Sequence, residues 1–166
     1  MKRLFIIRHA KSSWKDMSLD DYDRPLNKRG KLNAPLMGSR LKKETIKPDI
    51  ILSSPAKRAK STAKIIAKKL KYSKDIVFNK DIYDADIGVL HNILTKLPDE
   101  DEIVFLFGHN PDLEMLVENY VNFEENIPTC GIVEIEFDCK RWVDISAKNA
   151  TLISFDYPKK DIAQND

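Results

Sequence analysis

Two arginines and two histidines follow short apolar segments of the chain: Arg8, His9 and His109 come at or near the end of such a segment, and Arg58 lies in the turn and helix start after another. Taken singly, such residues more often serve as surface charges or hydrogen-bonded structural groups. As a set they suit phosphoryl chemistry, because arginine offers fixed, permanently charged donors for phosphate oxygens. A neutral imidazole nitrogen, with a pKa of about 6.5, is a competent nucleophile near neutral pH.

The apolar segments before these residues predict buried strands, because they are short, rich in large apolar side chains and bounded by polar residues. The three strands expected to carry the set span 2–8, 48–53 and 102–107. Further strands are expected over 75–83, 131–137, 142–144 and 151–157.

Apolar residues at helical spacing predict helices over 26–41, 54–70 and 88–97, and another after Pro111. Pro35 predicts that the first helix begins near Asn33, because proline is tolerated in a first turn but not in a helix interior. The residues expected to face inward from the first two helices are Leu32, Leu36, Met37, Leu41, Ala59, Ala63, Ile66 and Leu70.

Strands that alternate with helices predict an α/β fold with a sheet covered on both faces and ligands at the carboxyl ends of its strands. Two histidines and two arginines at the ends of three strands would then converge on one site. The length of 166 residues and the 42% hydrophobic content fit one globular domain, expected over 1–158, followed by a flexible C-terminal tail over 159–166.

The formal net charge is +2, but the charges are unevenly distributed along the chain. Lys and Arg dominate residues 28–80, and Asp and Glu dominate residues 81–138. The basic half suits an acidic or phosphorylated partner, with a lysine-rich solvated surface as the alternative, and we do not infer nucleic-acid binding. Cys130 and Cys139 form no zinc-like array and are expected to be reduced. The apolar run at 4–7 is too short for a signal or membrane segment, so a cytoplasmic location is expected.

Three motifs extend the pattern: Leu-Phe-Ile-Ile-Arg-His-Ala-Lys-Ser at 4–12, Ser-Ser-Pro-Ala-Lys-Arg-Ala at 53–59 and Phe-Gly-His-Asn-Pro at 107–111. With them the chain resembles the histidine phosphatase superfamily, which includes phosphoglycerate mutases and acid phosphatases. The resemblance implies a single-domain, three-layer α/β/α sandwich around a mainly parallel sheet, of the phosphoglycerate mutase-like type. It also implies that His9 accepts the phosphoryl group while Arg8, Arg58 and His109 bind its oxygens. Our own hypothesis is that surrounding cations keep His9 unprotonated before attack and that a protonated His109 strengthens phosphate binding.

Short members of the family, the SixA-type phosphohistidine phosphatases, are the most similar in pattern, with Asp-Arg-Pro-Leu at 23–26 and Arg-Gly at 29–30. Arg58 and His109 are separated by 51 positions (109 minus 58), which leaves little room for the helical cap of larger relatives. We therefore expect no cap and an open site. An open site admits a phosphate carried on another protein, whereas small-molecule enzymes usually enclose their substrates.

The sequence departs from the family pattern at Ala10, where glycine is common, and in lacking a clear counterpart of the glutamate that donates a proton in many relatives. Asp84 and Asp86 are the nearest candidates for this general acid, with turn and helix-capping roles as the alternative. An acid matters less for cleavage of a P–N bond, because the leaving imidazole has a pKa of about 6.5. The lack of a clear general acid therefore favours phosphohistidine as the substrate.

Ser12 and Asn110 are further candidates for binding the phosphate, through a hydroxyl and a backbone N–H respectively. Arg24 either borders the site or forms a salt bridge to Asp20, Asp21 or Asp23. No spacing of His, Cys or carboxylates predicts a metal site, and no glycine-rich phosphate loop is present. The expected chemistry thus needs neither a metal nor a cofactor.

These observations lead to one principal hypothesis and two alternatives. The principal one is a metal-independent, monomeric phosphatase that hydrolyses phosphohistidine on a protein, as in a phosphorelay or a sugar-transport phosphorylation chain. One alternative is a phosphomonoesterase for a small phosphorylated metabolite. The other is a non-catalytic module that binds phosphorylated or acidic proteins through an inactive pocket.

Overall fold

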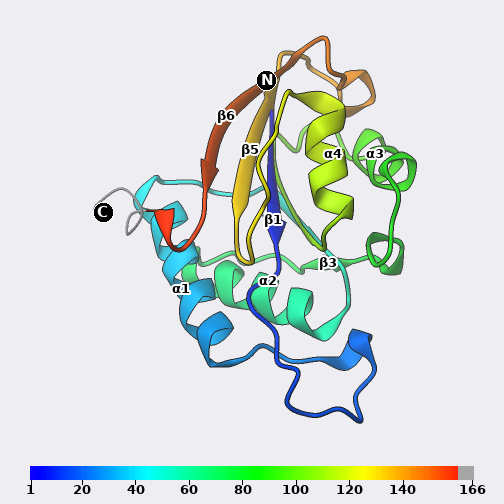
Figure 1. The fold of residues 1–166 in the computed structure, drawn as a ribbon. Helices are drawn as coiled ribbons and strands as arrows, with labels where there is room; N and C mark the ends of the chain where they lie inside the picture. The colour runs from blue at the N-terminus through cyan, green and yellow to red at the C-terminus, as the bar shows by residue number, and fades with distance from the viewer. Residues whose placement is uncertain (161–166) are drawn as a thin grey trace.

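A six-stranded sheet, in the order β3-β2-β4-β1-β5-β6, forms the centre of the computed structural model, which describes residues 1–160 (Figure 1). Strands β1 to β4 pair in parallel, and β5 runs antiparallel to both of its neighbours, β1 and β6. The expected mainly parallel sheet is therefore confirmed. The strands are β1 (Lys2–Arg8), β2 (Ile50–Ser53), β3 (Val77–Phe78), β4 (Ile103–Gly108), β5 (Ile132–Phe137) and β6 (Ala150–Asp156).

Helices cover both faces of this sheet, as the sequence predicts for an α/β/α sandwich. Successive strand residues point to opposite faces, and in β1 Phe5 packs in a cluster with Met37 and Ile66, whereas Leu4 packs with Leu90 and Leu116. The first face is covered by α1 and α2 and the second by α3 and α4 (Figure 1). The helices are α1 (Lys28–Lys43), α2 (Lys57–Lys69), α3 (Ile87–Thr95) and α4 (Asp112–Tyr120).

The register of the parallel strands brings the ends of β1, β2 and β4 to one level. Arg8 lies opposite Gly108, and Ser53 lies opposite Phe107. The backbone N–H of His9 continues this pairing by donating to the carbonyl of Gly108 at 3.1 Å. The three predicted turns after these strands therefore leave the sheet along the same edge.

The first helix begins earlier than the sequence pattern predicts. α1 starts at Lys28, and the side chain of Asn27 caps it by accepting a hydrogen bond from the N–H of Gly30 at 2.9 Å. Pro35 consequently lies inside the helix, and the prediction of a start near Asn33 is wrong. The cap at Asn27 and the packing of the first turn prevail over the local preference of proline.

The inward face of α1 also differs from the expected one. Met37 and Leu41 are buried, but Leu32 is 65% exposed and Leu36 is 42% exposed. The buried residues of α1 are Gly30, Ala34, Met37, Gly38 and Leu41. Small residues thus make up much of the inward face, and two leucines are left on the surface.

Two predicted strands are largely helical turns. Residues 75–83 form only the two-residue β3 followed by a 3-10 helix, Lys80–Ile82, and the expected edge strand at 142–144 is a 3-10 helix, Trp142–Asp144. Trp142 is fully buried and donates from Nε1 to the carbonyl of Asp101 at 2.6 Å. Its burial in the core explains the apolar signal that resembled a strand.

The chain between Arg58 and His109 forms the rest of α2, then β3, the 3-10 helix, α3 and β4, with no additional helical cap. Within residues 1–160, no helix is both long and apolar enough to cross a membrane. Of the tail expected over 159–166, the segment 161–166 lies outside the described residues, and Lys160 donates to the carbonyl of Phe155 at 2.6 Å.

Gly30 supports a testable prediction about how α1 packs. A Cβ at this position would lie 2.2 Å from the carbonyl oxygen of Lys11. We expect Gly30→Ala to lower the free energy of unfolding by roughly 1–3 kcal/mol in urea titrations, because backbone must move to relieve the overlap. Gly88→Ala is the matched control, since its Cβ would meet only the Asp86 side chain, at 3.3 Å. Equal stability of the two variants would contradict this account.

Candidate active site

His9 follows the last residue of β1 and is only 7% exposed. Its Nδ1 lies 2.7 Å from the carbonyl oxygen of Ala10. A carbonyl can only accept, so Nδ1 carries the ring proton and Nε2 keeps its lone pair. The Ala10 peptide is fixed in turn, because its N–H donates to Thr62 Oγ1 at 2.9 Å. The fold thus orients one nucleophilic nitrogen.

The surroundings of His9 keep the imidazole neutral. Burial lowers its pKa to about 3, and the nearby His109, Arg58 and Arg8 contribute in the same direction. Arg58 Nε lies 3.3 Å from His9 Nε2 and donates toward its lone pair. At neutral pH this nitrogen is therefore unprotonated, as attack on phosphorus requires.

His109 follows β4, and its ring lies 5.3 Å from that of His9 between centroids. Its Nε2 is 2.8 Å from Ser54 Oγ, whereas Nδ1 is buried without a hydrogen-bond partner among residues 1–160. Burial, followed by the charge of Arg58, lowers the pKa of His109 to about 4. The imidazole is thus neutral near pH 7, and only an added negative charge, such as a phosphoryl group, would favour the protonated form expected from the sequence.

Arg8 is held by a turn that the sequence did not suggest as part of the site. Its Nη1 donates to the carbonyl of Ile127 at 2.9 Å, and the N–H of Cys130 lies within 3.1 Å of the carbonyls of both Arg8 and His9. Arg8 Nε is buried and has no hydrogen-bond partner in the described part of the chain. A charged guanidinium N–H that lacks such a partner is a suitable donor for an oxyanion.

Arg58, in the first turn of α2, is oriented by Asp21. Its Nη1 donates to the Asp21 carbonyl at 2.6 Å and its Nη2 to Asp21 Oδ2 at 2.9 Å. Tyr83 OH donates to the same oxygen at 2.6 Å, and its ring lies edge-on to His109. The hydrogen bond from Tyr83, with those from Arg58 and Arg24, holds the pKa of Asp21 well below its ordinary value. Asp21 is a site residue that sequence reasoning missed.

Arg24 and Ser12 extend this network. Arg24 Nη1 lies 3.0 Å from Asp21 Oδ1, which confirms the salt bridge that the sequence offered as one of two roles for Arg24. Arg24 Nη2 donates to Ser12 Oγ at 2.6 Å. The Ser12 hydroxyl oxygen therefore accepts a hydrogen bond from Arg24, and the hydroxyl hydrogen is available to donate to a ligand.

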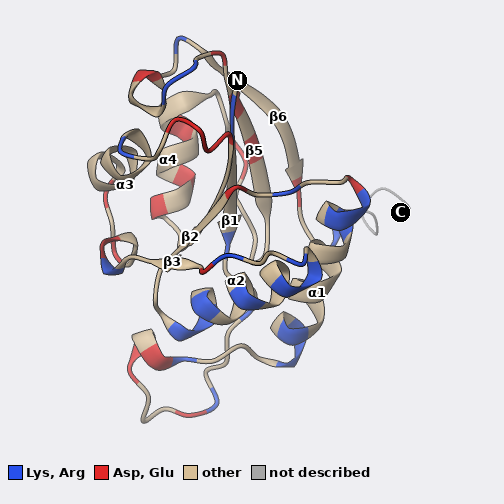
Figure 2. Ribbon diagram, turned by 180° about the vertical axis from the view of Figure 1, so that it is seen from behind, with Lys and Arg blue, Asp and Glu red and all other residues tan. Residues whose placement is uncertain are grey.

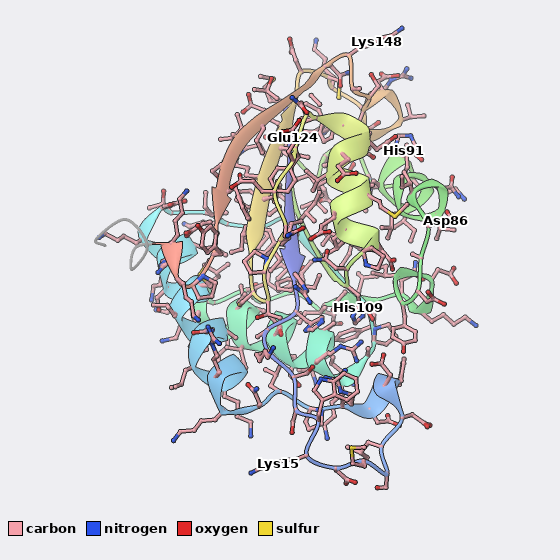
Figure 3. The ribbon with its side chains drawn as sticks, viewed as in Figure 1. Lys15, Asp86, His91, His109, Glu124 and Lys148 are labelled. Carbon is pink, nitrogen blue, oxygen red and sulfur yellow. The ribbon has the colours of Figure 1, made fainter. Side chains whose placement is uncertain are left out.

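The remaining candidates have structural contacts of their own. Asn110 donates from Nδ2 to Glu114 Oε1 and to the Ile127 carbonyl, both at 2.9 Å. Asp86 caps α3 by accepting from the N–H of Val89 at 2.8 Å, and Figure 3 shows it beside α3, apart from His109. Asp84 is exposed, with a positive φ of 53°. Within residues 1–160, neither aspartate forms a hydrogen bond or ion pair with the four central residues.

Among the described residues, no group of three or more His, Cys, Asp or Glu side chains is arranged to hold a metal ion. The polar groups that converge at the sheet edge are instead cations, imidazoles and N–H donors. Such a set has the chemistry to bind an anion, and His9 Nε2 could act on it as a nucleophile.

Comparison with known proteins identifies a family whose model matches most of the chain. The family model described as "Histidine phosphatase superfamily (branch 1)" matches residues 4–112. An uncharacterized chloroplastic protein of Arabidopsis thaliana is 29% identical over 155 residues, which cover 88% of this chain and 71% of that protein.

Two solved SixA structures share the fold. A SixA protein of Agrobacterium tumefaciens has a TM-score of 0.81 and 26% identity, with 95% of this chain and 98% of that chain covered. The protein histidine phosphatase SixA complexed with tungstate also has a TM-score of 0.81, at 22% identity, with 94% and 97% covered. These matches confirm the phosphoglycerate mutase-like fold that the resemblance implied.

The protonation of His9 can be tested by heteronuclear NMR. With a pKa lowered to about 3, the His9 ring should keep the chemical shifts of the Nδ1-protonated neutral form from about pH 7 to about pH 5. A solvated imidazole would titrate near pH 6.5 over this range. Spectra of His9→Gln assign the signal. Titration of that signal with a midpoint near 6.5 would show that burial does not control this group.

The role of Asp21 can be tested with Asp21→Asn. A neutral amide loses the charge that holds Arg58 and Tyr83, and hydrogen bonds to charged groups are worth about 1.5–3 kcal/mol. We expect kcat for p-nitrophenyl phosphate to fall by roughly ten- to a hundredfold. Asp23→Asn, in the same 3-10 helix, is the control and should change kcat little. Equal rates for the two variants would exclude a positioning role for Asp21.

Proposed function

Because the chain belongs to the histidine phosphatase superfamily, we propose that it is a protein phosphohistidine phosphatase that works through a covalent phosphohistidine on His9. One observation carries the proposal. The hydrogen bond from His9 Nδ1 to the Ala10 carbonyl leaves Nε2 unprotonated among three cationic or N–H donating side chains. This arrangement suits attack on a phosphorus atom.

In the first step, His9 Nε2 attacks phosphorus, and the bond from phosphorus to the substrate nitrogen breaks. The electron pair of that bond leaves on the substrate imidazole, which takes up a proton. In the second step, water attacks the phosphoryl group on His9. The water oxygen goes to phosphorus, and the proton that this water releases replaces the one taken up by the leaving imidazole. The products are inorganic phosphate, the dephosphorylated substrate and the original neutral His9, so water is the only co-substrate and no oxidant or reductant is needed.

Arg8, Arg58 and His109 are proposed to bind the phosphoryl oxygens through both steps. Their donors have fixed positions before the substrate arrives, which is the arrangement that stabilises developing charge most effectively. Ser12 can add its hydroxyl hydrogen and Asn110 its backbone N–H. The negative phosphoryl group would raise the pKa of His109 from about 4 toward neutrality, and a protonated His109 would then strengthen binding.

Within the described chain, neither candidate for the general acid is hydrogen-bonded to the central residues, and this favours a substrate with a P–N bond. Asp86 caps α3, and Asp84 has no hydrogen bond to the central residues among those described. A leaving imidazole, with a pKa of about 6.5, departs without a strong acid, whereas a serine alkoxide does not. Assignment of Asp84 or Asp86 as the acid remains a proposal that matters chiefly for ester substrates.

Accessibility of the site favours a protein substrate over a free metabolite. No helical cap interrupts the chain between Arg58 and His109. The Asp21 side chain that holds Arg58 is itself 48% exposed. A phosphohistidine on the surface of another domain can approach such a site, as in a phosphorelay or a sugar-transport phosphorylation chain. Independence from metals, a monomeric state and a cytoplasmic location belong to the same proposal.

The decisive measurement is time-resolved phosphate release from a histidine-phosphorylated carrier protein and from p-nitrophenyl phosphate, with a chelator present. We expect fast release from the carrier and slow action on the ester. His9→Ala should lose nearly all turnover on both while keeping its circular dichroism spectrum. His91→Ala is the matched control, because His91 lies on α3 and bonds to Tyr120 OH at 2.7 Å.

Other outcomes would redirect the assignment. Preference for the ester would favour a phosphomonoesterase of small metabolites. Tight binding of the phosphorylated carrier without phosphate release at any pH would favour a non-catalytic module. Full activity of His9→Ala would exclude His9 as the nucleophile.

A further inference from the structure

A groove of about 950 Å³ lies next to the candidate site, between the loop after β1 and the start of α1. Figure 3 shows Lys15 on the part of this loop that extends past the end of β1, beyond the same sheet edge as His109. The lining residues are Lys11, Ser12, Ser13, Trp14, Lys15, Pro25, Leu26, Asn27, Lys28, Arg29, Lys31 and Leu32.

The groove is a built feature of the fold, because hydrogen bonds pin both of its walls. The N–H of Asn27 donates to the Lys11 carbonyl at 2.9 Å, and the N–H of Ser13 donates to the Pro25 carbonyl at 2.8 Å. Ser12 and Leu26 form a β-bridge between the same two segments. The exposed side chains on these walls are thus held at defined positions.

Two large apolar side chains of the groove face solvent. Trp14 is 68% exposed and Leu32 is 65% exposed. The Trp14 ring is held in place by the Arg24 guanidinium, which lies 3.2 Å from its centroid. Leu36, one turn beyond Leu32 on α1, is 42% exposed. An exposed apolar patch with a rigid aromatic residue is typical of a surface that another protein covers.

The charge of the groove is of one sign. Its lining includes five Lys and Arg residues and no Asp or Glu. Figure 2 shows that Lys and Arg also recur along α1 and α2. The exposed aspartates of the adjoining loop, at 16–23, lie outside the groove lining. A long polyanion that ran past the groove would meet these aspartates, whereas a compact acidic face would meet only the cations.

A chain of contacts connects the groove with the reacting atoms. Arg24 packs on Trp14 and bonds to Asp21, Asp21 holds Arg58, and Arg58 reaches His9. A partner that covers Trp14 would therefore lie beside the site that takes its phosphoryl group.

We propose that this groove docks the phosphorylated protein substrate, through an acidic surface whose apolar residues pack on Trp14 and Leu32. The inference rests on the proposed function and adds the recognition surface and the chemistry of the partner. The lysines speed the encounter and orient the partner, and the apolar contacts slow its dissociation.

The test compares two substrates that share one reactive bond. One is an acidic histidine phosphocarrier protein, phosphorylated on its histidine, and the other is free phosphohistidine, which has no protein surface. In the double variant Lys28→Glu/Lys31→Glu, we expect kcat/KM for the carrier to fall at least about tenfold more than kcat/KM for free phosphohistidine. Rising ionic strength should lower the carrier rate of the wild type and affect the variant less.

A matched control changes the same charge elsewhere on the basic surface. Lys64 and Lys68 are exposed on α2 and outside the groove lining. Lys64→Glu/Lys68→Glu should keep the wild-type ratio of the two kcat/KM values. Trp14→Ala should lower the ratio of kcat/KM for the carrier to kcat/KM for free phosphohistidine, without altering the net charge. Because Trp142 is fully buried, quenching of the exposed Trp14 fluorescence reports binding of the carrier.

The outcomes separate this inference from the proposed function. If the wild type releases phosphate from neither substrate, the proposed function fails. If it acts on the carrier but both groove variants keep the wild-type ratio, the docking surface is wrong and the function stands. Quenching of Trp14 by a single-stranded oligonucleotide, at concentrations where the carrier has no effect, would also overturn the proposal.

Discussion

One parallel register, shared by β1, β4 and β2, is the constraint on which the site depends. Arg8 opposite Gly108 and Ser53 opposite Phe107 bring the next residues of each strand, His9, Ser54 and His109, to one edge. A slip of a single residue would turn the side chains of a strand to the other face of the sheet. The two faces pack against different sets of side chains, so a slip would exchange these sets and disrupt the close packing of both clusters. The packing of the core therefore helps to fix which residues meet at the edge.

Gathering cations around a neutral nucleophile has opposing consequences. The positive charges attract an anion and add to the burial that keeps His9 unprotonated, but they also repel one another in a partly buried place. The ionised Asp21 lies between Arg24 and Arg58 and offsets this repulsion. Burial lowers the pKa of the Arg8 guanidinium, while the charge of Glu114 acts in the opposite direction. The Asp21 carboxylate is therefore important for holding several cations close together at the site.

The strand ends and the residues at them could be predicted because short apolar runs are a local signal. The start of α1 could not be predicted, because proline favours a first turn near Asn33 whereas asparagine favours a cap at Asn27. The cap at Asn27 and the packing of Gly30 against Lys11 belong to the observed start. The role of Asp21 could not be predicted for a different reason. It is one of several acidic residues in its loop, and nothing local shows which of them reaches Arg58, 37 positions further along the chain. Contacts of this kind depend on topology that a single sequence does not display.

The paired ends of the loop after β1 have a consequence for how such proteins diversify. Because Ser12 bridges to Leu26 and Ser13 bonds to Pro25, the loop between them is closed by the protein irrespective of its length. The entropic cost of closing a flexible loop grows only slowly, by about 0.6 kcal/mol for each doubling of its length. Insertions between Lys15 and Asp20 would then change which surfaces the protein meets while the sheet edge stays intact. The outer part of this loop can therefore change in length while the paired residues at its base keep their positions.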